Sequence, residues 1–134
     1  LIDQMFESMH AAAGIGLAAV QVGSLWRLFI THLPKDLPRV FINPDIVETS
    51  LEQVSYEEGC LSIPGVNADL VRPGEVRVQA WNQKGRPFAT DADGLLARVI
   101  QHEIDHLNGV LFIDRLDPKK RERLVKQYES APLA

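Results

Sequence analysis

The stretch DGLLARVIQHEIDHLNG, residues 93–109, decides the fold, because it predicts a helix whose histidines and glutamate are enclosed by apolar side chains. Asp93 can cap the N-terminus, and Asn108-Gly109 is a typical stop signal after Leu107. At about 100° per residue, two adjoining stripes of the helix mix apolar and ionisable side chains. They consist of Leu95, Val99, His102 and His106, and of Leu96, Ile100, Glu103 and Leu107. Such a helix is expected in a core.

The histidine pair in this helix indicates a metal site. Two histidines at i and i+4 bring both imidazoles to one side, where they can bind one divalent cation. Glu103 lies one position round, which suits a general base acting on metal-bound water. The five-residue pattern is equally compatible with two polar-faced histidines and a surface glutamate. Burial favours the metal, because enclosed polar groups cost several kcal/mol unless they are satisfied.

Two histidines leave a zinc-like site one protein ligand short. The metalloprotease pattern with a third histidine is excluded, because Phe112 stands at that position. A carboxylate from Glu122 or Glu129 remains open, although both lie in a charged stretch typical of a solvated helix face. Cys60, in YEEGCLSIPG, is the best remaining candidate.

The rest of the chain predicts an α+β fold, with antiparallel strands packed around the central buried helix and a further helix at the C-terminus. We expect a helix over residues 1–13, which Gly14 would end, and strands over 25–31 and 40–44. Residues 75–90 predict a hairpin, and Asp117-Pro118 should begin the last helix. We expect residues 1–134 to form a single catalytic domain that lacks an N-terminal segment, because the chain opens without methionine.

Composition narrows the class of protein. The net charge is −4, with 46% hydrophobic and 24% charged residues, as in a globular protein and unlike a duplex-binding one. The single cysteine excludes an internal disulfide. We expect no membrane span, because the apolar runs are far shorter than about 20 residues.

Three motifs, in order along the chain, resemble those of the peptide deformylases, metal-dependent hydrolases that remove the N-formyl group from nascent polypeptides. They are GIGLAAVQ at 14–21, EGCLS at 58–62 and QHEIDH at 101–106. The resemblance implies the following roles. Cys60, His102 and His106 would bind the metal, Glu103 would be the acid and base, and Gln21 with the backbone N–H of Leu61 would donate to the oxyanion. By residue type alone, Gln21 is a polar residue that ends a buried Gly/Ala-rich segment.

The resemblance also implies how a substrate is held. Ile15, Gly16 and Gly59 would make main-chain contacts with an extended peptide, as in strand addition. Leu95 and Val99 would line an apolar pocket for the methionine side chain, although both also suit a packed core.

The cofactor expected from the resemblance is one divalent ion, with Fe2+ as the native metal and Zn2+, Ni2+ or Co2+ also able to bind. Ligand softness alone would favour zinc. The implied partner is an N-formylmethionyl peptide, in a bacterial-type cytoplasm or an organelle. Residues 119–123, KKRER, suit a ribosome contact or, more simply, a solvated helix face. Two alternatives stay open: a metallopeptidase with a carboxylate third ligand, and a metal-stabilised binding module that does not need Glu103.

Overall fold

The computed structural model describes residues 1–60 and 63–130, without the side chains of Cys60, 63–66, Phe112 and 127–130. Its elements, in chain order, are α1 (Ile2–Ala11), β1 (Gly16–Ala18), η1 (Ala19–Val22), β2 (Leu28–Thr31), β3 (Arg39–Thr49), β4 (Gln53–Cys60), β5 (Ile63–Pro73), β6 (Glu75–Trp81), β7 (Pro87–Asp93), α2 (Gly94–Leu107), η2 (Phe112–Arg115) and α3 (Pro118–Ser130). The η elements are single turns of 3-10 helix.

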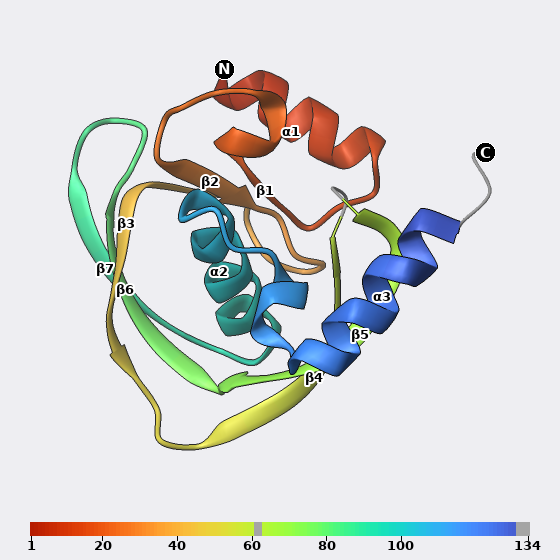
Figure 1. Cartoon of the computed structure of the whole chain (residues 1–134). Coiled ribbons are helices and arrows are strands. Elements are labelled where there is room, and N and C mark those ends of the chain that lie inside the picture. The colour runs from red at the N-terminus through yellow and green to blue at the C-terminus, as the bar shows by residue number, and fades with distance from the viewer. Residues whose placement is uncertain (61–62, 131–134) are drawn as a thin grey trace.

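The strands form two antiparallel sheets around α2, which confirms the α+β prediction. Five strands pair in the order β1-β2-β3-β6-β7, and β4 pairs with β5 in a separate two-stranded sheet. Figure 1 shows α2 at the centre of the molecule, with strands of both sheets around it and α3 alongside β5. The helix that carries the histidines is therefore the central element, as its sequence predicts.

The alternation of side chains along β2 explains why helices cover both faces of the larger sheet. Leu28 and Ile30 point to one face and pack with Met5 and Met9 of α1. Phe29 points to the other face and joins the core cluster that includes side chains of α2. Every residue of β2 is buried, which is the pattern of a strand enclosed on both sides.

The ends of the predicted helices are partly as expected. α2 ends at Leu107, and Gly109 then takes the left-handed conformation, φ 76°, that the stop signal predicts. Asp93 occupies the N-cap position, but its side chain makes no capping hydrogen bond. The prediction for the first helix was wrong in detail, because α1 ends at Ala11 and Ala13, not Gly14, takes the positive φ of 56°.

Other predictions concern the strands and the last helix. The hairpin over 75–90 is confirmed as β6 and β7, and Asp117 caps α3 by accepting hydrogen bonds from the Lys119 and Lys120 N–H groups. β1, β4 and β5 were not predicted. Of the helices that the structure describes, none is long and apolar enough to cross a membrane.

Candidate metal centre and cleft

The centre of the site is the histidine pair of α2. The Nε2 atoms of His102 and His106 lie 2.9 Å apart, with the rings nearly edge to face. One ligand atom from each of His102, Glu103 and His106 lies within 4.8 Å of the other two. His106 and Glu103 are buried and His102 is partly buried, because the strands around α2 enclose this face. Three of the predicted site residues, His102, Glu103 and His106, therefore lie together on one face of α2.

Glu58 of β4 sets the orientation of the His102 ring. Its Oε1 atom lies 2.9 Å from Nδ1 of His102. An ionised carboxylate only accepts hydrogen bonds, so Nδ1 carries the proton, and in the neutral ring Nε2 presents its lone pair towards His106.

This donor set fits a divalent metal ion. Two ring nitrogens that each bind a tetrahedral ion at about 2.1 Å lie about 3.4 Å apart, so the 2.9 Å spacing found here would need to widen by only about 0.5 Å. A metal-ligating histidine usually donates its other N–H to a carboxylate, as His102 does to Glu58.

Two arginines hold Glu58 ionised. Arg72 donates from Nε and Nη2 to the two Glu58 oxygens at 2.7 and 3.0 Å, and Arg98 donates from Nη1 at 2.7 Å. Burial by itself raises the pKa of Glu58, but the hydrogen bonds from His102, Arg72 and Arg98 outweigh it and lower that pKa to about 2, from 4.5. The carboxylate is therefore charged at every physiological pH.

Asp105 extends this network to the other side of Arg72. It accepts from Arg72 Nη1 at 2.8 Å, and Arg115 of η2 donates to both of its oxygens. The sequence left open whether Asp105 orients a ligand or pairs with an arginine such as Arg72. The structure shows the arginine pair, and Arg72 in turn contacts Glu58, which orients His102. Glu58 itself had no predicted role, and its only sequence signal is its place in EGCLS.

Gln21 and Gly16 bring the first motif against α2. The Oε1 atom of Gln21 accepts a hydrogen bond from the Ala18 N–H at 2.9 Å, which orients the side-chain amide. A Cβ atom at Gly16 would lie 2.7 Å from Val99 Cγ1 and 3.3 Å from Glu103 Oε1. Glycine is thus required at this position by the close approach of α2 to β1.

A cleft of about 460 Å³ joins these elements. Most of the predicted site residues line it: Ile15, Gly16, Gln21, Gly59, Leu95, Val99, His102 and Glu103. Leu95 is 42% exposed, whereas Val99 is buried and packs against Gly16. The cleft runs from the first motif, past the histidine helix, to the end of β4.

The remaining candidates differ in how far the structure describes them. Cys60 is the last residue of β4, directly after Gly59 of the cleft, but its side chain lies outside the described part. Leu61 lies outside the described residues, as does the side chain of Glu129. Glu122 is exposed and pairs with Lys126 at 3.3 Å, and it is not in the group of ligand atoms around His102. The structure therefore contradicts Glu122 as the third metal ligand.

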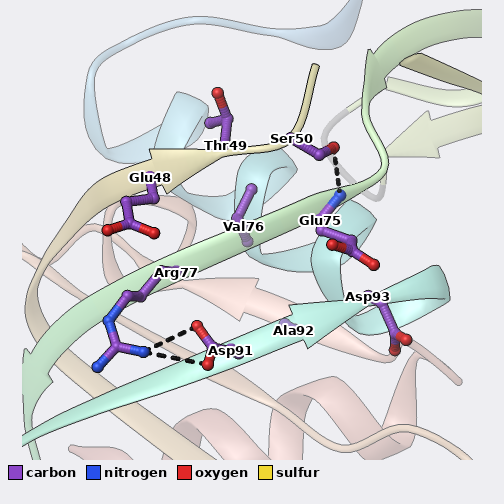
Figure 2. Close-up of a pocket in the computed structure, with 9 residues that line it drawn as sticks. All are labelled: Glu48, Thr49, Ser50, Glu75, Val76, Arg77, Asp91, Ala92 and Asp93. Atoms are coloured by element: carbon purple, nitrogen blue, oxygen red, sulfur yellow. Dashed lines mark hydrogen bonds and ion pairs between the residues drawn. The ribbon is translucent and has the colours of Figure 1, made fainter. Parts of the chain in front are cut away.

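A second hollow, of about 450 Å³, lies over β3, β6 and β7. Figure 2 shows its lining, in which Arg77 pairs with Asp91 among further acidic side chains. None of the predicted site residues that the structure describes belongs to this lining, so the candidate site is the cleft beside α2.

Comparison with known proteins agrees with the geometry. Residues 1–122 match the family model described as polypeptide deformylase. The peptide deformylase of Treponema pallidum strain Nichols is 51% identical over 127 residues, covering 95% of this chain and 78% of that protein. The peptide deformylase of Azotobacter vinelandii is 52% identical over 131 residues, covering 96% and 78%.

Solved structures of the same family superpose closely. The peptide deformylase of Legionella pneumophila gives a TM-score of 0.90 at 42% identity, covering 96% of this chain and 76% of that one. The enzyme of Synechococcus elongatus, solved in complex with actinonin, gives 0.90 at 46%, covering 97% and 73%. Family model, sequence identity and fold all agree, and the chain belongs to the peptide deformylase family of enzymes.

Proposed function

We propose that this chain is a metal-dependent hydrolase that removes the formyl group from N-formylmethionyl peptides. The observation that carries the proposal is the pair of Nε2 atoms, 2.9 Å apart, on His102 and His106, with Glu103 beside them at a cleft. Family membership supports the same reaction. A structural metal site would not need a buried general base, so Glu103 argues against a binding module.

Cys60, His102 and His106 would hold one divalent cation. Fe2+ is the proposed native metal, with Zn2+, Ni2+ or Co2+ able to replace it. When bound, the cation would polarise the formyl carbonyl and make water nucleophilic at neutral pH. The ionised Glu58 supports this assignment, because it fixes the His102 tautomer in which Nε2 can act as a ligand.

Glu103 and Gln21 would carry the proton transfer and the oxyanion stabilisation. Glu103 would take a proton from the attacking water and deliver it to the departing amine, which needs a carboxylate held close to both. Gln21 would donate from its side-chain amide to the carbonyl oxygen as negative charge develops, together with the N–H of Leu61. The hydrogen bond from Ala18 to Gln21 Oε1 supports this role, since it leaves the NH2 as the donor end of an oriented group.

The peptide would lie along the cleft. Ile15, Gly16 and Gly59 would contact its main chain, and Leu95 and Val99 would face the methionine side chain. All five line the cleft, and they come from the first motif, β4 and α2, which supports an extended substrate between these segments. The exposed side chain of Leu95 suits a pocket more than a core.

We place this activity on nascent chains in a bacterial-type cytoplasm or an organelle. A ribosome contact through Lys119, Lys120 and Arg121 remains part of the proposal. These residues are exposed on the first turn of α3, which supports their access to a large partner. Reversing the three charges should weaken cosedimentation with ribosomes. An unchanged sedimentation profile would contradict the proposed ribosome contact.

The first test is an anaerobic assay of the Fe2+-loaded chain with formyl-Met-Ala-Ser, scored for free amine and for intact peptide bonds. We expect release of the amine without peptide cleavage. Cleavage of a peptide bond, or metal loading without any release, would contradict the proposal.

Two variants assign the roles. Glu103→Ala should lose about 100-fold or more of the turnover while it retains the metal, because a general base contributes about 10²–10⁴-fold. Cys60→Ala should instead lose the metal. A Cys60→Ala protein that keeps full metal content would show that the third ligand is another residue.

A further inference from the structure

A second pair of histidines lies outside the cleft. His10 is in the last turn of α1, and His32 directly follows β2. Their Nε2 and Nδ1 atoms lie 2.9 Å apart, the same spacing as in the catalytic pair of α2. The rings meet edge to face, with centroids 5.1 Å apart and planes at 63°. These two pairs account for all four histidines of the chain.

Both rings sit on firmly placed backbone. α1 is anchored by Met5 and Met9, which are fully buried, so the position of His10 at the helix end is fixed. The His32 N–H donates to the Ile15 carbonyl at 2.9 Å, which ties the end of β2 to the first motif. The fold therefore brings two ring nitrogens together from two separate elements, α1 and the end of β2.

The surroundings favour a cation. His10 lies at the C-terminal end of α1, where the helix dipole is negative. Asp36 also lies near His32, and its carboxylate accepts hydrogen bonds from Arg39 at 2.8 and 3.0 Å, which hold the pKa of Asp36 below its usual range. His10 is exposed and His32 is partly exposed, so water can complete the coordination of an ion.

We propose that His10 and His32 form a second metal site, separate from the cleft, that binds a borderline transition-metal cation such as Zn2+. Imidazole nitrogens suit zinc, copper and nickel, and the 2.9 Å spacing would widen to about 3.4 Å around one tetrahedral ion, which the exposed side chain of His10 allows. A bound ion would link α1 to β2 across the turn that leads to Ile15 and Gly16. It would stabilise the wall of the cleft without entering it.

The test is equilibrium dialysis of the full chain against Zn2+, with metal counted per protein. We expect one equivalent more in the wild type than in His10→Gln or in His32→Gln. Ser8→Ala, an exposed change in the same helix, is the matched control and should bind as the wild type does. This difference of one equivalent is independent of the proposed deformylase activity, because the cleft ligands are the same in all four proteins.

A thermal scan supplies a second measurement. Zn2+ should raise the unfolding midpoint of the wild type by about 4 °C more than that of either histidine variant. Equal Zn2+ content in the wild type and both histidine variants would overturn the proposal. The 2.9 Å contact would then be only a hydrogen bond between two imidazoles.

Discussion

The orientation of the His102 ring depends on Glu58. We therefore predict that replacing Glu58 changes the affinity of the cleft for a metal ion. Glu58→Gln keeps the size of the side chain but removes the charge that holds the proton on Nδ1 of His102. We expect the affinity of the cleft for Zn2+ to fall about 10–100-fold, the usual effect of losing such a partner. Competition with a chromophoric chelator measures this affinity.

The neighbouring Glu57 supplies the control. Its side chain is exposed and lines the cleft, but Glu57 does not belong to the group of possible metal ligands around His102, so Glu57→Gln should leave the Zn2+ affinity unchanged. A Glu58→Gln protein that binds Zn2+ as tightly as Glu57→Gln would show that the His102 ring is oriented by other contacts.

The close packing of Gly16 against α2 can be tested by substitution. In Gly16→Ala the new Cβ would meet Val99 Cγ1 at 2.7 Å, closer than packed atoms allow, so the Val99 side chain or the backbone of β1 or α2 must shift. We expect the free energy of unfolding to fall by about 1–3 kcal/mol in urea titrations. Val99→Ala removes the clashing atom, so the double variant should lose less stability than the sum of the two single variants. Strictly additive losses would place the strain elsewhere.

At the scale of elements, the sequence predicts the helices and strands that have a local signal, either a side-chain periodicity or a turn motif. The 3.6-residue periodicity of 93–109 predicts α2, and the turn residues near Gly85 predict the hairpin of β6 and β7. β4 and β5 escaped prediction because their buried side chains include charges. Glu58 and Arg72 are each only 5% exposed, yet as single residues they resemble a solvated face. Their burial follows from pairing with each other and with α2, which no local pattern records.

The ionic link between β5 and α2 can be tested against a matched surface pair. Arg72 is buried and contacts Glu58 and Asp105, whereas Arg77 pairs with Asp91 across β6 and β7 with both side chains exposed. Arg72→Met should lower the free energy of unfolding by about 3–5 kcal/mol, because it leaves buried carboxylates short of a partner. Arg77→Met should cost about 1 kcal/mol or less.

Urea titrations of both variants at neutral pH decide this comparison. Similar losses would mean that the network around Glu58 does not hold the smaller sheet against the histidine helix. The larger expected loss for Arg72→Met should come with weaker Zn2+ binding, since Arg72 and Asp105 support His102 through Glu58.

At the scale of the whole molecule, the three motifs come from separate elements and meet only because the sheets enclose α2. The sequence selected residues of all three motifs together with Leu95 and Val99, and eight of the selected residues line one cleft. What it did not predict is the layer behind them, in which Arg72 and Arg98 bind Glu58; of this layer, only the pair of Asp105 with Arg72 was named, as one of two open possibilities. A catalytic motif has a fixed spacing, but its supporting charges come from distant positions and are recognised only once the fold brings them together.

This buried layer predicts how the stability of the molecule depends on pH. The pKa of Glu58 is lowered from 4.5 to about 2, so the folded state holds this proton less tightly than the unfolded state does. The resulting stabilisation, on the order of 3 kcal/mol, is fully present above pH 4.5 and is lost as the pH falls towards 2. Urea unfolding of the metal-free chain between pH 7 and pH 3 measures it, with Glu58→Gln as the reference. Carboxylates elsewhere titrate alike in both proteins, so the stability advantage of the wild type over Glu58→Gln should shrink steadily below pH 4.5. An advantage that stays constant over this range would mean that Glu58 is not held ionised by Arg72 and Arg98 in the folded chain.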